Sequence, residues 1–580
     1  MLRECVEVFQ NKLSENNGII LDTYIPADGT YIIVDEEGNI QSRTDIIKDK
    51  KTKQIDKSVE ALKKIVLYDY NSVLVSMNKP VDSKKAIHSN NYLSFAVKKE
   101  SISSGKLTEE IIDEYYDVLS DPLHKKYFRS KEASAICMEF EENEGKPDLE
   151  KLERSKKWIK ENIFKLSGID FEQKNYLKIF FEASREEYER ENKRYLLPNI
   201  YNSNDYNITI NDKIFGIPND NLGMNAKKPF LSIKTRKNPS PYLLDRDEVI
   251  NQKYFFDYLM NLVSEGKYHI YVDTDKNEIY GCKNGNSPEQ INTGYYMRIA
   301  KGKNEAEIQD QDNISDYRQN LKKRFEYKNV LGRHYDDSYQ IYDNRLAVGA
   351  IIDEIYFSKW LSSNYNVDEG DMRINDENLK KNILYSRKVI FDWVFKGIDH
   401  GIANTLGKAG LTALKNSLLN DYRELALRQF NMLFSFREYF SEKGDVKMGE
   451  IISNIRDKVG MKVQAVEVVP IESDDEYYYC VGQLAKYLIS QSKAKDITHS
   501  LLNPIINARN DKNLKKRLMQ MYKKYNYQIK NSYKYTERLL AMVMGYEPEG
   551  KVDQEKLLLG YACDNVLFKS KKEKGECDYE

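Results

Sequence analysis

The 580-residue chain has little of what metal centres and membrane anchors require. Its six cysteines are scattered without a C-x-x-C pair, which disfavours a structural zinc site and fits a reducing compartment. Its six histidines are dispersed, with no pair that one helix face would align. No apolar run approaches the roughly 18 residues of a membrane span. We therefore expect no metal, no cofactor and no membrane, and a cytoplasmic location.

The N-terminus also lacks the continuous apolar core of a secretory signal. Instead, Leu2, Val6, Phe9 and Leu13 recur at the spacing of one helix face. The pattern predicts an amphipathic helix that belongs to the folded protein.

Catalytic signatures are missing too. The chain has no phosphate-binding G-x-x-x-x-G-K-[ST] loop and no G-x-S-x-G nucleophile motif. Two carboxylate pairs are candidates for Mg²⁺: Asp273 with Asp275 brackets a turn, and Asp336 with Asp337 lacks the His-Asp dipeptide of phosphohydrolase-type nucleases. Both pairs are more typical of structure than of catalysis. We expect a binding protein and not an enzyme.

Charge is nearly balanced, but it is unevenly distributed. The net charge is −1. Residues 481–545 nevertheless hold ten Lys and three Arg against three acids, a net of +10. Acidic charge gathers elsewhere, as in residues 139–150. This polarity can steer an anionic ligand to one face of a soluble protein.

The length predicts two to four domains, and the patterns predict an α+β fold. Residues 1–365 indicate a mixed α/β region with β-hairpins, and an acidic segment after residue 365 introduces an all-α helical bundle over 366–580. The expected hairpins cover 29–41 and 267–281. The expected helices cover 149–165, 174–194, 380–398, 411–439, 448–459, 477–492 and 511–525.

The clearest helix, 511–525, separates apolar from basic side chains. Leu514, Leu518, Met521 and Tyr525 fall on one arc, while Lys512, Lys516 and Lys523 lie opposite. A solvated face often carries lysine, but a face selected only for stability tends to alternate signs. The scarcity of acids favours contact with phosphates.

Residues 216–244 form a basic, amide-rich segment. Four prolines and two glycines prevent a single long helix, and no carboxylate follows Asp220. Lys and Arg can meet phosphates while Asn can contact a base edge, although a solvated linker has a similar composition. Residues 77–99 combine the same residue types near the N-terminus.

Together with a third segment, these two resemble one family. The third segment is CVGQLAKYLISQSKAKDITHSLLNPIINARN over 480–510, continued by KKYNYQIK at 523–530 and MVMGYE at 542–547. In this order the segments are similar to the large subunit of the type I-B CRISPR Cascade complex (the Cas-eight-b family, Csh-type). The resemblance spans most of the chain.

The resemblance implies a non-catalytic subunit of an RNA-guided surveillance complex in antiviral defence. Such a subunit recognises the protospacer-adjacent motif on double-stranded DNA, stabilises the opened strands and helps to recruit the helicase-nuclease. The implied partners are the backbone, guide-processing and small subunits, the guide RNA, the target DNA and the helicase-nuclease. A metal-dependent nuclease subunit and a general RNA-binding scaffold remain alternatives.

Two sets of candidate contacts follow. The flanking-motif set consists of Asn219, Asn221, Asn225, Lys227, Lys228, Lys234, Thr235, Arg236, Lys84, Lys85, Asn90 and Asn91. The displaced-strand set consists of Lys493, Lys495, Lys515, Lys516, Lys523, Lys524 and Lys530. The resemblance also implies that the C-terminal bundle can be made separately, as the small subunit, by internal initiation. Codons for residues 443–445 could form a ribosome-binding sequence, so that Met448 would start a product over 448–580, with Met432 and Met461 as rival starts.

Overall fold

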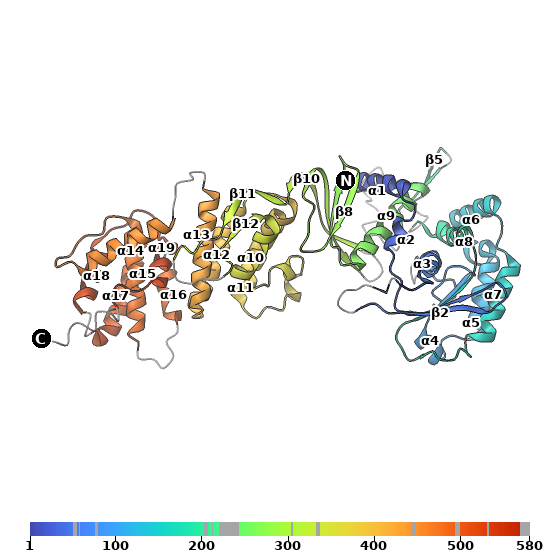
Figure 1. The fold of residues 1–580 in the computed structure, drawn as a ribbon, viewed down its shortest axis with the longest axis horizontal. Helices are drawn as coiled ribbons and strands as arrows, with labels where there is room; N and C mark the ends of the chain where they lie inside the picture. The colour runs from blue at the N-terminus through green and yellow to red at the C-terminus, as the bar shows by residue number, and fades with distance from the viewer. Residues whose placement is uncertain are drawn as a thin grey trace. The chain divides into compact units, whose positions relative to one another are not determined.

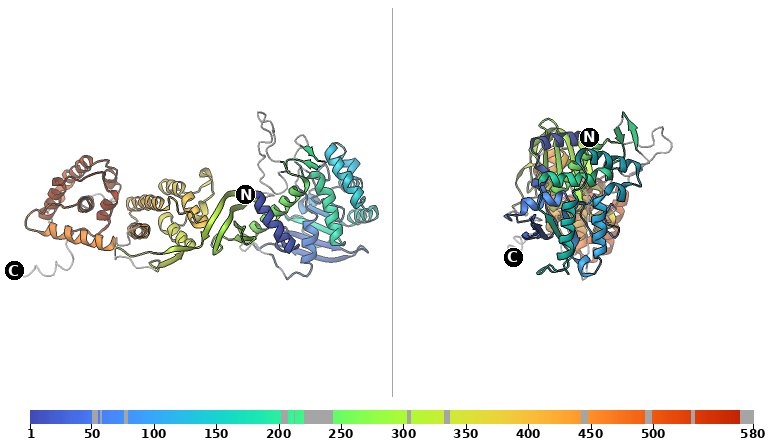
Figure 2. Two further views of the ribbon diagram at one scale, coloured as in Figure 1. Left: turned by 90° about the horizontal axis from the view of Figure 1, so that it is seen from above. Right: turned by 90° about the vertical axis from the view of Figure 1, so that its right-hand side faces the viewer.

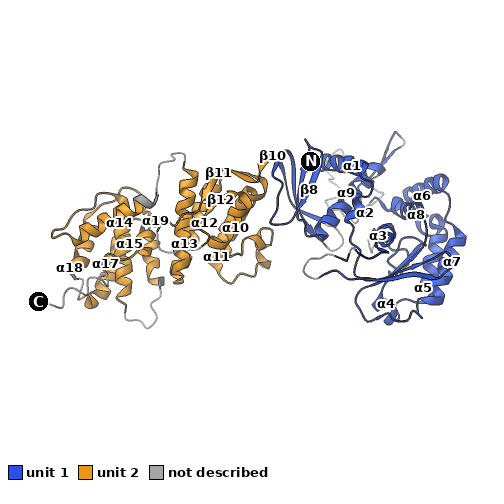
Figure 3. Cartoon of the chain, viewed as in Figure 1, with its two compact units in different colours: residues 1–316 blue, residues 317–580 orange. Residues whose placement is uncertain are grey.

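The computed structural model describes residues 1–49, 55–56, 58–75, 79–201, 207–211, 213–219, 243–302, 306–331, 337–441, 448–492, 499–529 and 533–568. The chain divides into two compact units, Met1–Asp316 and Tyr317–Glu580 (Figure 3). This boundary falls within strand β10 (Ala306–Arg318), earlier than the boundary after residue 365 that the acidic segment suggested. Helix α10 (Arg345–Phe357) explains the difference, because it packs with the helices that follow it.

The first sheet of the first unit has the strand order β2-β1-β4-β3. Strands β1 (Gly29–Val34) and β2 (Ile40–Ile46) form the predicted antiparallel hairpin. Strand β4 (Tyr176–Phe181) runs parallel to β1, and β3 (Ser94–Lys98) runs antiparallel to β4. The apolar sequence of β1 is fully buried, as expected for a strand that is covered on both faces.

The prediction of one helix over 174–194 is wrong in its first half. The run YLKIFF forms the central strand β4, whose aromatic and β-branched residues are buried. Only α8 (Arg185–Leu196) is helical. Its start is fixed by Ser184 and Glu187, whose side chains accept from each other's backbone N–H groups in a capping box.

Helices cover both faces of this sheet (Figure 1). On one face, α3 (Leu62–Tyr70) meets α8, where the rings of Tyr68 and Tyr188 stack at 4.2 Å. On the other face lie α5 (Glu109–Ser120) and α7 (Leu149–Asn162), whose Trp158 ring meets Phe181 of β4. The sheet is therefore the middle layer of three.

The second sheet of the unit has the order β10-β9-β7-β8. Strands β7 (His269–Asp273) and β8 (Glu278–Cys282) confirm the second predicted hairpin, and β9 (Gln290–Lys301) pairs with β7. The N-terminal helix α1 (Leu2–Glu15) and α9 (Arg246–Ser264) pack against this sheet. The other elements of the unit are α2 (Ile19–Thr23), α4 (Lys99–Ser103), η1 (Leu123–Tyr127), α6 (Lys131–Glu144), η2 (Leu197–Asn199), β5 (Ile208–Ile210) and β6 (Lys213–Phe215).

The second unit begins with the two-stranded sheet β11 (Asn320–Glu326) and β12 (Ile341–Asn344). After it, the described residues contain helices and no strand, which confirms the α+β prediction. None of the described helices is long and apolar enough to cross a membrane. The helical elements after α10 are η4 (Ser362–Asn364), η5 (Glu369–Asp371), α11 (Glu377–Phe391), η6 (Asp392–Lys396), α12 (Ile402–Leu419), α13 (Arg423–Phe440), α14 (Met448–Gln464), α15 (Asp474–Ser490), η7 (His499–Leu502), α16 (Asn503–Ile506), α17 (Asp511–Tyr525), η8 (Asn526–Gln528), α18 (Tyr533–Gly545) and α19 (Gln554–Ala562).

The single helix predicted over 411–439 is two helices. Between α12 and α13 the chain turns at Asp421, whose φ of 61° lies in the left-handed region. The sequence carries neither Gly nor Pro at this point, so the residues that usually indicate the end of a helix do not predict this turn.

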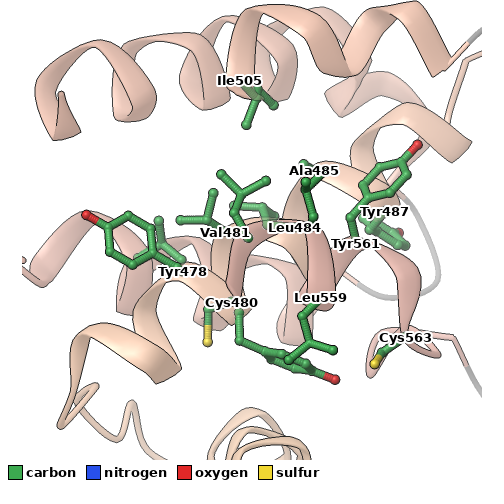
Figure 4. Packing of buried hydrophobic residues seen from close by; sticks show 14 of the residues in the cluster. Tyr478, Cys480, Val481, Leu484, Ala485, Tyr487, Ile505, Leu559, Tyr561 and Cys563 are labelled. Carbon is green, nitrogen blue, oxygen red and sulfur yellow. The ribbon is translucent and has the colours of Figure 1, made fainter. Parts of the chain in front are cut away.

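Helix α15 is the centre of the C-terminal bundle, and α14, α17, α18 and α19 pack around it (Figures 2 and 4). Two glycines bring α15 and α19 into backbone contact. A Cβ on Gly482 would lie 2.0 Å from the Leu557 carbonyl oxygen, and one on Gly560 would lie 2.1 Å from that of Tyr479. Only glycine fits at either position.

Candidate nucleic-acid interface

Helix α17 has the bounds that the sequence predicted. The Asn510 side chain caps it by accepting from the Asn513 backbone N–H at 2.9 Å. Leu514 and Leu518 are buried in the apolar core of the bundle, and Tyr525 is buried as well. The apolar arc therefore anchors the helix and turns its opposite side to solvent.

The exposed side of α17 is a basic arc. Among the described residues, no carboxylate oxygen lies within 4.0 Å of its cationic groups. Residues 499–529 carry seven Lys and Arg and a single acid, Asp511. Tyr527 follows with 53% of its surface exposed. The arc consists of Lys512, Lys516, Arg517, Lys523 and Lys524.

Arg517 is a member that the prediction missed. It is exposed, and its guanidinium donates to the Gln520 side-chain oxygen at 3.1 Å. On the helical wheel it flanks the lysines on the same side as Lys524, so the periodicity that identified the arc also identifies Arg517.

Lys515 differs from its neighbours on α17. The prediction that it contacts the displaced strand is wrong, because its amino group is used within the protein. Its amino group pairs with Asp511 at 3.0 Å and donates to the backbone carbonyl of Tyr546. It also lies 5.7 Å from the centre of the Tyr477 ring. Burial, reinforced by a hydrogen bond to the Asp511 carboxylate, raises the pKa of Tyr477. Lys515 thus joins α17 to α15.

The flanking-motif set is only partly described. Lys84 and Lys85 are exposed on a turn that Asp82 fixes by accepting from the backbone N–H groups of Ala86 and Ile87, at 2.8 and 3.1 Å. Lys85 has a φ of 53°. Both lysines face solvent and remain candidates for phosphate contact.

The prediction that Asn90 and Asn91 contact DNA is wrong, because both side chains are buried. Each has 1% of its surface exposed. The Asn90 amide donates to the Val73 carbonyl at 2.8 Å. The Asn91 amide donates to the Asn71 carbonyl at 3.1 Å, and its oxygen accepts from the Leu93 N–H at 3.0 Å. These amides form hydrogen bonds with backbone groups in the core, where no base can reach them.

Asn219 is likewise buried, at 1% exposure. Its side-chain amide donates to the Asn199 carbonyl at 3.0 Å. It therefore holds the chain where the basic segment begins and does not read bases. The remaining candidates lie outside the described residues: Asn221, Asn225, Lys227, Lys228, Lys234, Thr235 and Arg236 in one set, Lys493, Lys495 and Lys530 in the other.

Of the two candidate carboxylate pairs, the structure fully describes Asp273 with Asp275. One oxygen of the buried Asp273 accepts from the backbone N–H groups of Asp275 and Lys276 at 3.1 and 2.9 Å, so Asp273 fixes the turn after β7. Asp336 lies outside the described residues. Within the described part of the chain, no three His, Cys, Asp or Glu side chains are placed to hold a metal ion.

No family model and no curated protein matches the chain. The family resemblance therefore stays a prediction from the three sequence segments. The candidate interface rests on the geometry of α17 and of the turn at Lys84 and Lys85.

Proposed function

We propose that the chain is the non-catalytic large subunit of a type I-B CRISPR surveillance complex, and that its basic arc holds the displaced single strand of the target. The observation that carries the proposal is the row of exposed cations on α17, none of which has an acidic partner among the described residues. Lysines of this kind bind phosphates without regard to sequence, and Tyr527 offers a ring at the end of the row for base stacking.

Recognition of the flanking motif is the second part of the proposal. It rests on Lys84 and Lys85 and on the basic segment that begins after Asn219. The lysines supply phosphate contacts that fix the register, and base reading then belongs to amides of the segment beyond Asn219. Recruitment of the helicase-nuclease completes the proposed role.

A separate product from Met448 would contain α14 to α19. It would lack α12 and α13, whose Leu414, Phe430 and Phe434 belong to the same apolar core as α15 and α19. We therefore propose that such a product is stable only where another surface covers this face of the bundle.

The test is an electrophoretic shift of the assembled guide complex with and without this chain. The variant K512A/K516A/K523A/K524A removes four cations of the basic arc. Because each phosphate contact to a single strand contributes about 0.7 to the slope of log affinity against log salt, we expect the slope to fall by about 3. Duplexes that differ only in the flanking bases test motif recognition in the same assay.

The matched control is K125A/K157A/K359A/K388A, which removes four lysines that each have an acidic partner in the structure. Its salt slope should equal that of the unmodified chain. If the two variants had equal salt slopes, the proposal that the basic arc contacts DNA would be wrong. If the chain improved binding equally on every duplex, the proposal of motif recognition would be wrong. The chain would then act as a sequence-independent clamp.

A further inference from the structure

A cleft of about 220 Å³ opens in the first unit where the parallel strands β1 and β4 end. Val34 and Phe181, the last residues of these strands, form its floor together with Leu93. The turn between β1 and β2 makes one wall, and α7 makes the other. Ligands of open α/β sheets bind outside the carboxyl ends of parallel strands, so the position is one where a site is expected.

Trp158 of α7 provides an immobilised aromatic ring in this cleft. Its indole N–H donates to the Gly38 carbonyl at 2.8 Å. The Phe181 ring packs against it edge-on, with centroids 5.8 Å apart and planes at 84°. Because both contacts fix the indole, the ring needs no reordering when a ligand stacks on it.

Ser155 lies one helical turn before Trp158 and also lines the cleft. Ser155 is 3% exposed. It adds a hydroxyl, which can both donate and accept a hydrogen bond, to the lining of the cleft.

The charge of the cleft is negative. Five carboxylates line it against three basic side chains. Of the bases, Lys151 pairs with Glu187 outside the cleft, and Arg154 donates to the Glu36 backbone carbonyl at 3.4 Å. The carboxylates of Glu36 and Glu37 are exposed and have no basic partner within 4.0 Å in the described part of the chain. The excess of acid disfavours a nucleotide and favours a cation.

We propose that this cleft receives one arginine side chain of a protein partner. A guanidinium stacks on an indole and donates several N–H groups in one plane, so that it can contact the Trp158 ring and the carboxylates of the acidic turn at the same time. The volume is below the usual range of small-molecule pockets, roughly 300–1,000 Å³, and suits a single side chain. The inference does not depend on DNA binding by α17.

The test uses the full chain labelled with 5-fluorotryptophan. Three tryptophans give three ¹⁹F signals, and Trp158→Phe identifies one of them. The probe is the peptide acetyl-Gly-Arg-Gly-amide, with the uncharged citrulline peptide and AMP as comparisons. We expect the arginine peptide to shift the Trp158 signal to saturation, and the other two compounds to leave it unchanged.

The variant Glu36→Gln/Glu37→Gln should weaken binding roughly tenfold. Glu142→Gln/Glu144→Gln, which makes the same charge change at the exposed end of α6, should not. An unmoved Trp158 signal, an equal response to citrulline or AMP, or equal weakening in both variants would overturn the proposal. Electrophoretic shifts of Glu36→Gln/Glu37→Gln should match the unmodified chain, which separates this site from the proposed DNA interface.

Discussion

Two regions that the sequence marked alike for DNA contact differ in the structure. In the first unit, the segment around Lys84 to Asn91 places its amides in the core and its lysines outside. In the second unit, α17 places an entire row of lysines outside. The difference follows from chemistry. An amide both donates and accepts, so that buried backbone groups can satisfy it, whereas an ammonium only donates and stays in water unless an acid accompanies it.

The same distinction operates within α17. Lys515 pairs with Asp511 and packs against the bundle, while Lys516 faces solvent and has no acid within 4.0 Å in the part of the chain that the structure describes. A count of basic residues therefore overestimates a nucleic-acid interface. Exposed cations without acidic partners are the better measure.

Substitution of Asn91 by Ala tests the buried side of this comparison and should have the largest effect. It would leave the Asn71 carbonyl and the Leu93 N–H without the side-chain partner they have now, while the Ser94 hydroxyl would keep only its longer contact with the Asn91 backbone carbonyl. Since each buried group left unpaired costs about 1–3 kcal/mol, we expect the free energy of unfolding to fall by about 3 kcal/mol or more. Urea denaturation measures it.

Lys84→Ala is the control from the same segment, and it should change stability by no more than about 0.5 kcal/mol. If Asn91→Ala instead left stability intact and weakened DNA binding, the amide would belong to the interface after all and the comparison would fail.

The sequence predicted the elements whose signals are local. Helix α17 follows from the spacing of Leu514 and Leu518 after the Asn510 cap, and both hairpins follow from alternation around polar turns. It missed strand β4, because whether YLKIFF forms a helix or a central strand depends on the distant partner β1. It also placed the unit boundary by composition, whereas the packing of α10 decides it.

The candidate site shows the same limit. Exposure of the lysines on α17 could be predicted, because the apolar arc orients the helix. Burial of Asn90, Asn91 and Asn219 could not, because it depends on backbone groups far along the chain, such as those of Val73 and Asn199. The cleft at Trp158 was missed for that reason as well, since strands and helices distant in sequence assemble it.

His88 sharpens the comparison through pH. It lies between the exposed lysines and the buried amides, half-buried and edge-on to Tyr176 at 5.4 Å. Burial, followed by the charges of Lys98, Lys106 and Lys178, lowers the pKa of His88 to about 4. Between pH 6.5 and 4 the unfolded chain binds a proton that the folded chain does not, so stability falls as the pH falls through this window.

We expect the proton uptake of His88 on unfolding to lower the free energy of unfolding by about 2 kcal/mol when the pH falls from 7 to 4.5. Urea denaturation of the unmodified chain and of His88→Gln at both pH values isolates it, because the other titrating groups are common to the two proteins. An identical pH dependence in the variant would show that the imidazole protonates as freely in the folded state as in the unfolded one.

The smallest effect separates two adjacent residues. Lys515→Ala removes the ion pair with Asp511 and the hydrogen bond to Tyr546, so unfolding should become easier by about 1 kcal/mol while the salt slope of DNA binding stays constant. Lys516→Ala should leave stability unchanged and lower the slope by about 0.7. The two variants lose the same charge from the same helix, so only the direction and partners of the side chain distinguish them. Equal slopes would mean that net charge, and not the exposed arc, governs binding.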